Sequence, residues 1–175
     1  MSTHFSIRLA SSDDASCIAA LGMQVWLRTY ATTGISTSIA NYVLREFTED
    51  RYRQLIADTK KQLMIAEVDG YLVGYVIIGL GNTFTNVHVE IEKLYVQEYF
   101  TGQGIGKDLL ASAQLTAYGY CASSSVWLTV NAKNQNAIAF YNQLGYRHEG
   151  DTDFVLDGVK YKNYVMVVRP RNNQS

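Results

Sequence analysis

Three features of the sequence predict an α+β, or mixed α/β, fold with one central sheet and helices on its faces. The 175 residues are 47% hydrophobic and 18% charged, which suits one globular domain with a sizeable core. Segments with the two-residue period of strands are interrupted by segments with helical spacing. Asp-Gly pairs and glycine-rich turns separate several of these segments. We therefore expect a single domain over residues 1–170 and a polar tail at 171–175.

The strands and helices are expected in a definite order. Asp69-Gly70 lies between two apolar runs, which favours a hairpin because both residues of such a turn need positive φ. Gly145 follows a helical pattern in the usual C-cap position. The expected strands cover residues 5–9, 63–68, 71–79, 87–96, 126–130, 153–156 and 161–168, with a loop at 79–86. The expected helices follow the N-cap residues 11–13 and cover residues 39–59, 104–119 and 134–144.

Composition argues against several classes of protein. The net charge of −1 lacks the basic surplus that nucleic-acid binders usually carry. The longest apolar stretch, 71–80, is about half the ~20 residues that a membrane helix needs, and the start of the chain has no signal region. Cys17, Cys121 and the three histidines lack the spacing of metal ligands. We expect a cytoplasmic protein with no metal and no nucleic-acid or membrane partner.

The segment Thr101-Gly102-Gln103-Gly104-Ile105-Gly106-Lys107 lies between an expected strand and an expected helix. Glycines at alternate positions let the backbone approach a ligand closely, and the first helical turn leaves N–H groups unpaired. Together these features suit a phosphate or pyrophosphate. The spacing fits neither the P-loop nor the dinucleotide fingerprint. Spacing alone leaves open a plain glycine-rich turn.

Two segments resemble motifs of one enzyme family. Residues 91–96 with 102–110 resemble the coenzyme A motif of the GNAT acetyltransferases, and residues 134–146 are similar to the family's next motif. Two motifs in the right order are more specific than either alone. Within the family, the chain looks similar to bacterial polyamine acetyltransferases of the PaiA type.

The resemblance implies a fold, a co-substrate and a set of binding residues. The sheet is expected to be mostly antiparallel and to splay open near Val96, with helices on both faces and acetyl-CoA as co-substrate. Backbone groups of the strand end would bond the pantetheine arm, and N–H groups of the glycine turn would hold the pyrophosphate. The implied cofactor-binding residues are Leu94, Tyr95, Val96, Gly102, Gln103, Gly104, Ile105, Gly106, Lys107, Asn134, Ala137 and Phe140. The family usually has Arg or Gln where this chain has Thr101, which leaves a side-chain contribution there open.

Acetyl transfer to an amine needs a base and an acid. An alkyl ammonium has a pKa near ~10 and must lose a proton before it attacks, and the thiolate of coenzyme A leaves better when protonated. Tyr141 matches the family's tyrosine near the thioester sulfur and is the implied acid. Helical spacing alone would make Tyr141 part of an apolar stripe. Glu92 matches an acidic position in polyamine-acetylating relatives and is the implied base, the alternative being a solvated strand-face carboxylate.

The acceptor site is expected to be aromatic and acidic. Trp26 and Tyr30, with Tyr42, offer cation–π contact to an amine, although each also suits an ordinary core. Glu92 belongs to this site as well as to the catalytic pair. Several further carboxylates would attract a polycation or form a solvated surface, namely Glu46, Glu49, Asp50, Asp151 and Asp153.

The leading hypothesis is therefore an N-acetyltransferase that acts on a small primary amine, with polyamines first, through direct attack in a ternary complex. One alternative is acetylation of a protein N-terminus or lysine. Another is a non-catalytic domain that senses acyl-CoA. The last strands are also able to pair across a homodimer interface by edge addition.

Overall fold

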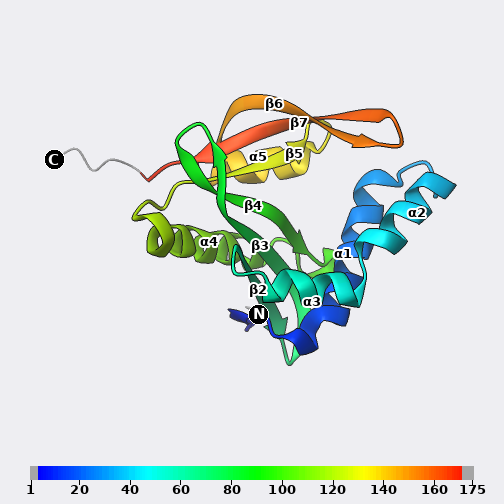
Figure 1. The fold of residues 1–175 in the computed structure, drawn as a ribbon, viewed down its shortest axis with the longest axis horizontal. Coiled ribbons are helices and arrows are strands. Elements are labelled where there is room, and N and C mark those ends of the chain that lie inside the picture. Colours follow the sequence, from blue (N-terminus) through cyan, green and yellow to red (C-terminus); the bar gives the residue numbers. More distant parts are fainter. Residues whose placement is uncertain (1–3, 171–175) are drawn as a thin grey trace. The chain divides into compact units, whose positions relative to one another are not determined.

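The computed structural model describes residues 4–170, and it contains the predicted mixture of a central sheet and helices (Figure 1). Seven strands form the sheet: β1 Ser6–Leu9, β2 Lys61–Val68, β3 Tyr71–Phe84, β4 Val87–Val96, β5 Val126–Asn131, β6 Arg147–Leu156 and β7 Val159–Val168. The helices are α1 Ala15–Tyr30, α2 Thr37–Glu46, α3 Glu49–Ala57, α4 Ile105–Cys121 and α5 Gln135–Gln143. Short 3₁₀ turns are η1 Ser12–Asp14 and η2 Glu98–Phe100.

The strands follow the order β1-β2-β3-β4-β5-β7-β6. Strand β1 is antiparallel to β2, and β7 is antiparallel to both of its neighbours. Strands β4 and β5 are parallel and pair at Glu90↔Trp127 and Ile91↔Leu128. A mixed sheet with mostly antiparallel pairs confirms the predicted fold class. Strand β6 lies at an edge of the sheet, where a strand of a second copy could be added. Pairing of two copies through this edge stays a prediction.

The described residues form two compact units, and β3, β4 and α4 each contribute to both. The first unit comprises 4–78 and 93–110, and the second comprises 79–92 and 111–170. A single domain over residues 1–170 stays a prediction, and the expected tail at 171–175 lies outside the described residues.

The core of the first unit is formed where α1 packs against α2 and α3 and where α3 packs against β2. Its fully buried side chains include Ile18, Tyr52, Ile65, Tyr75 and Ile105. The core of the second unit is formed by alternate residues of β5, by β7 and by α4, and includes Val126, Leu128, Met166, Ala113 and Ala117. Burial of this apolar surface is the main stabilising contribution to both units.

The region expected as one helix over 39–59 is instead two helices, α2 and α3. Phe47 ends α2 and is buried, and Thr48 begins α3 as its N-cap, where its side chain accepts a hydrogen bond from the Arg51 N–H. A capping side chain favours an extended backbone at its own position, so the helix breaks there.

Strands β3 and β6 extend furthest beyond their expected bounds. Strand β3 continues to Phe84, through the region expected as a loop, and only Thr85 and Asn86 connect it to β4. The glycines at 79 and 81 suggested a loop, but here they occur within a long strand. Strand β6 begins at Arg147 rather than at residue 153 because its antiparallel pairing with β7 extends from Arg147 to Leu156, although its side chains are mostly exposed. Its alternation is further interrupted by an irregularity between His148 and Gly150.

Within residues 4–170, no helix combines the length and the apolar character that crossing a membrane would require.

Candidate active site

The glycine turn joins η2 to α4 in the first unit, and two of its residues have positive φ angles. Gly102 has φ +76° and Gly104 has φ +90°, values that side-chain-bearing residues rarely adopt. A Cβ at either position would point into open space, with no protein atom within 4 Å. The first helical hydrogen bond of α4 runs from the Asp108 N–H to the Gly104 carbonyl, at 3.0 Å. The helix therefore offers no acceptor to the preceding N–H groups, which is the arrangement that binds anions.

Side chains around this turn contribute to its shape. The Thr101 hydroxyl donates to the Glu98 carbonyl at 2.8 Å, and the Gln103 amide donates to the Tyr99 carbonyl at 3.1 Å. Ile105 is buried and anchors the start of α4, whereas Lys107 is exposed. The side chains of Thr101 and Gln103 thus form hydrogen bonds with carbonyl groups of η2. The groups that the turn offers to a ligand are therefore those of its backbone.

The end of β4 lies close to β3 in the same unit. The Gln97 N–H donates to the Val73 carbonyl at 2.8 Å, and a Cβ at Gly74 would lie 3.1 Å from the Tyr95 carbonyl oxygen. Leu94, Tyr95 and Val96 are half-buried. The Tyr95 ring meets the buried Tyr75 ring edge-on, with 5.4 Å between centroids. This packing fixes the strand segment that the family resemblance assigns to pantetheine.

The aromatic residues expected at the acceptor site pack together in the first unit. The Trp26 ring stacks on Tyr30 at 4.6 Å and lies 4.7 Å from Tyr42, and Trp26 is only 4% exposed. Burial raises the pKa of Tyr42. Trp26 therefore serves as a core residue, and a direct contact to an amine depends on the half-buried Tyr30 and Tyr42.

The two glutamates of β4 are joined by one amide in the second unit. Asn82 Nδ2 donates to Glu90 Oε2 at 2.8 Å and to Glu92 Oε1 at 3.0 Å. Glu90 and Glu92 are both half-buried. The pair concentrates negative charge on one face of the hairpin between β3 and β4.

Tyr141 lies on α5 in the second unit and is 9% exposed. Its ring lies 5.4 Å from that of Phe140 and 5.5 Å from that of Tyr146. A tyrosine with the ordinary pKa of about 10 is already protonated at neutral pH, and burial raises the pKa of Tyr141 further. A protonated hydroxyl is the state that a general acid needs.

The start of α5 contains the remaining predicted residues. Asn134 is the N-cap, and its side-chain oxygen accepts a hydrogen bond from the Ala137 N–H at 3.1 Å. This bond accounts for Asn134 and Ala137 as helix-capping residues. An amide oxygen has a second lone pair and the side chain also carries two N–H donors, so the capping bond is compatible with a contact to acetyl-CoA.

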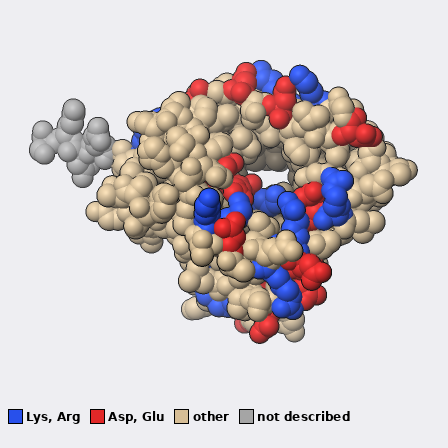
Figure 2. Space-filling model, in the orientation of Figure 1, with Lys and Arg blue, Asp and Glu red and all other residues tan. Residues whose placement is uncertain are grey.

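Most of the other acidic side chains that were expected to attract a polycation are paired with basic ones. Glu46 binds Arg45 and Arg51, Glu49 binds Arg53, Asp151 binds Lys162, and Asp153 lies 3.7 Å from Lys160. Figure 2 shows acidic and basic side chains interspersed along β6 and β7, at the top of the view. These carboxylates therefore match the solvated, charge-balanced surface that the sequence left as the alternative.

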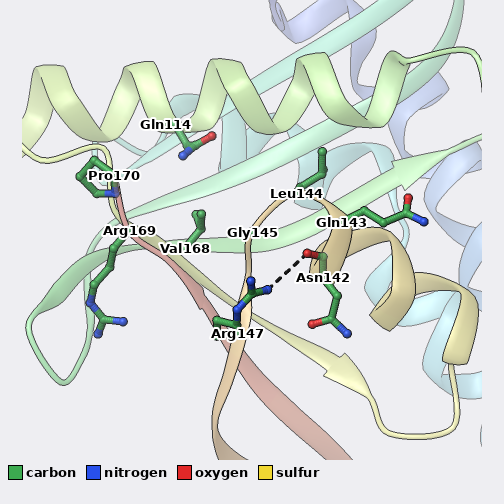
Figure 3. Close-up of a pocket in the computed structure, with 9 residues that line it drawn as sticks. All are labelled: Gln114, Asn142, Gln143, Leu144, Gly145, Arg147, Val168, Arg169 and Pro170. Carbon is green, nitrogen blue, oxygen red and sulfur yellow. Dashed lines mark hydrogen bonds between the residues drawn. The ribbon is translucent and has the colours of Figure 1, made fainter. Parts of the chain in front are cut away.

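A cavity of about 590 Å³ lies in the second unit, at the C-terminal end of α5 (Figure 3). Arg147 donates to the Asn142 carbonyl there at 3.4 Å, and Arg169 pairs with Glu149. None of the predicted catalytic or cofactor-binding residues lines this cavity. Its lining residues are Gln114, Asn142, Gln143, Leu144, Gly145, Arg147, Val168, Arg169 and Pro170.

Groups of three or more His, Cys, Asp or Glu residues placed to hold a metal do not occur in the described part of the chain.

Sequence reasoning missed Asn82, because it lies in the region that was expected to be a loop. Its signal was the pair of glycines at 79 and 81 just before it. A Cβ at Gly79 would lie 2.6 Å from both Asn82 Nδ2 and Glu92 Oε1, so a larger residue there would make one of these side chains shift.

Comparison with known proteins identifies the family. Residues 24–146 match the model of the acetyltransferase (GNAT) family. An uncharacterised N-acetyltransferase of Mycobacterium tuberculosis is 33% identical over 129 residues, which cover 74% of this chain and 80% of that protein. The spermine/spermidine N(1)-acetyltransferase of Bacillus subtilis is 26% identical over 98 residues, which cover 54% of this chain and 64% of that protein.

Among solved structures, the PaiA N-acetyltransferase of Thermoplasma acidophilum, in complex with coenzyme A, has a TM-score of 0.77 at 22% identity. The match covers 95% of this chain and 99% of that one, and it shows the same fold. From the family match and the similar N-acetyltransferases, the chain belongs to the GNAT family and is an acetyl-CoA-dependent N-acetyltransferase.

Proposed function

We propose that the acceptor is a small cationic primary amine, with polyamines as the first compounds to test. The observation that supports this proposal is the pair of β4 carboxylates held by Asn82, because adjacent negative charges attract an ammonium group. The similarity to a spermine/spermidine acetyltransferase over part of the chain points in the same direction.

The glycine turn is proposed to bind the pyrophosphate of acetyl-CoA. Its open glycine positions let phosphate oxygens approach the backbone N–H groups at the start of α4. Backbone groups of Leu94, Tyr95 and Val96 are proposed to bond the pantetheine arm. Asn134, Ala137 and Phe140 on α5 are the remaining proposed contacts.

Glu92 and Tyr141 are proposed to carry out the proton transfers of the reaction. Glu92, directly or through water, takes a proton from the acceptor ammonium, and the neutral amine nitrogen then attacks the thioester carbonyl carbon. Tyr141 gives its proton to the sulfur as the carbon–sulfur bond breaks. The second proton that leaves the nitrogen as the amide forms restores the Tyr141 hydroxyl, directly or through water. Two observations support these roles: Tyr141 holds its proton at neutral pH, and the Glu92 carboxylate accepts a hydrogen bond from Asn82.

Thiol release from acetyl-CoA, measured over a panel of amines, tests the proposal. The panel contains spermidine, spermine, putrescine, amino acids, aminoglycosides and short peptides with free N-termini or lysines. We expect the fastest turnover with a polyamine. Fastest turnover with a peptide would replace the small-amine acceptor with a protein acceptor. Tight binding of acetyl-CoA without turnover of any amine would overturn the proposed acceptor class.

A further inference from the structure

The Asn82 side chain donates a hydrogen bond to the carboxylate of Glu92, the proposed base. One carboxamide nitrogen carries two N–H donors, and Asn82 Nδ2 lies 2.8 Å from Glu90 Oε2 and 3.0 Å from Glu92 Oε1. Hydrogen bonds to ionised acceptors are stronger than those between neutral groups. This geometry restricts the position of the Glu92 carboxylate relative to its strand.

Asn82 is itself held in place by its backbone. Trp127 Nε1 donates to the Asn82 carbonyl oxygen at 2.9 Å, and Trp127 is the cross-strand partner of Glu90. The Trp127 ring also packs against Phe84, with 5.8 Å between centroids. Trp127 of strand β5 thus fixes the position of the Asn82 backbone relative to the two glutamates.

Two glycines make this arrangement possible. Gly81, immediately before Asn82, has φ +88°, a backbone conformation that favours glycine. At Gly79, an added Cβ would lie 2.6 Å from each of the two bonded atoms, Asn82 Nδ2 and Glu92 Oε1. A separation of 2.6 Å is shorter than ordinary van der Waals contact, so any side chain at this position would displace the pair.

We propose that Asn82 is a positioning residue, which orients Glu92 to take the proton from the acceptor amine. The inference rests on the base role proposed for Glu92. A general base must lie within hydrogen-bond reach of the proton that it removes, and small misplacements of catalytic groups reduce the rate strongly. Asn82 acts through Glu92 and needs no contact with the substrate.

A double-mutant cycle tests the proposal, with Asn82→Ala, Glu92→Gln and the combined variant assayed with the fastest amine of the panel. We expect Asn82→Ala to lower kcat by about 10-fold while KM for acetyl-CoA stays unchanged. In the Glu92→Gln background, the same substitution should cause no further loss, because the residue through which it acts is already disabled.

Matched variants separate positioning from general damage to the hairpin. Asn82→Asp keeps the shape but replaces the donor with an acceptor, so it should lower kcat at least as much as Asn82→Ala. Gly79→Ala should also lower kcat, because it displaces the same pair without changing Asn82. Asn86→Ala, an exposed residue in the turn of the same hairpin, should leave kcat unchanged.

Three outcomes would contradict the proposal, and they are distinguishable. An equal loss of kcat from Asn82→Ala in both backgrounds would show that Asn82 does not act through Glu92. An unchanged kcat in Asn82→Ala, with a large loss in Glu92→Gln, would remove Asn82 and keep Glu92 as the base. An unchanged kcat in Glu92→Gln would overturn the base assignment of the proposed function itself.

Discussion

Gly102 and Gly104 in the first unit have no side chains to offer, whereas Glu92 and Tyr141 in the second unit are proposed to act only through theirs. The glycine turn presents backbone N–H groups, and its requirement is a positive φ and open space. The second unit presents a carboxylate and a buried hydroxyl, and its requirement is a particular chemical group in a particular environment. A backbone site should therefore tolerate changes in neighbouring side chains, and a side-chain site should be sensitive to the loss of one oxygen.

The largest effect is expected from Tyr141→Phe, which removes one buried hydroxyl. We expect kcat at neutral pH to fall by ~10²-fold or more, because the thiolate would leave without a proton. The affinity for acetyl-CoA should be kept. Steady-state kinetics and calorimetry with coenzyme A measure the two quantities.

Tyr146→Phe is the matched control, since its ring lies 5.5 Å from that of Tyr141. The Tyr146 hydroxyl is buried and has no hydrogen-bond partner among residues 4–170. Its removal should keep kcat within about twofold and raise the free energy of unfolding by about 1–3 kcal/mol. Equal losses of kcat in both variants would remove Tyr141 from its proposed role.

Gly104→Val tests the backbone site. Valine is strained at φ +90°, which costs about 1–3 kcal/mol, and its side chain would project into the space that a phosphate needs. We expect acetyl-CoA to bind at least ~10-fold more weakly in calorimetry, which corresponds to about 1.4 kcal/mol.

Gly119→Ala is the control on the same helix, because its φ is not in the positive range and its Cβ would also meet open space. It should leave acetyl-CoA affinity unchanged and stabilise α4 by roughly 0.5–1 kcal/mol. Wild-type affinity in Gly104→Val would show that the pyrophosphate binds elsewhere.

Buried tyrosines in both units predict a loss of stability in alkali. Burial raises the pKa of Tyr52 to about 12, and it raises the pKa values of Tyr75, Tyr141 and Tyr146 above the ordinary value of about 10. The unfolded chain therefore loses these protons first. The stabilisation is complete below pH ~10 and is lost as pH rises further.

We expect the free energy of unfolding to fall above pH ~10, by up to about 1.4 kcal/mol per pH unit for each such tyrosine. Denaturant unfolding at pH 8 to 11 measures this dependence. Tyr146→Phe should make it shallower, whereas Tyr71→Phe, at a residue that is 77% exposed, should not. A pH dependence that is identical in the two variants would show that burial of Tyr146 has no such effect.

The smallest effect is expected from Thr101→Ala. The variant loses the hydroxyl bond to the Glu98 carbonyl but leaves the glycine backbone in place. The affinity for acetyl-CoA should change by less than about threefold, in line with one exposed hydrogen bond. A change as large as that in Gly104→Val would mean that side chains, and not only the backbone, form the cradle.

Local signals in the sequence determined much of this molecule. Asp69-Gly70 forms the expected turn, with φ +50° and +79°, and positive φ at Gly102 and Gly104 agrees with the expected glycine turn. The helix expected over residues 134–144 occurs as α5, with Asn134 as its N-cap. The two family motifs predicted the GNAT acetyltransferase fold and activity. These features depend on residues that are near neighbours in the chain, so their chemistry is readable from the sequence.

Only the tertiary structure decided which distant side chains meet. Asn82 and Glu92 are joined because β3 continues through two glycines and returns as β4 in a particular register. The burial of Trp26 and Tyr141, and the pairing of Asp151 with Lys162, likewise depend on elements that pack or pair after the chain has folded. A one-residue shift in register would turn a strand's side chains to the opposite face, so a sequence pattern without the register cannot specify these contacts.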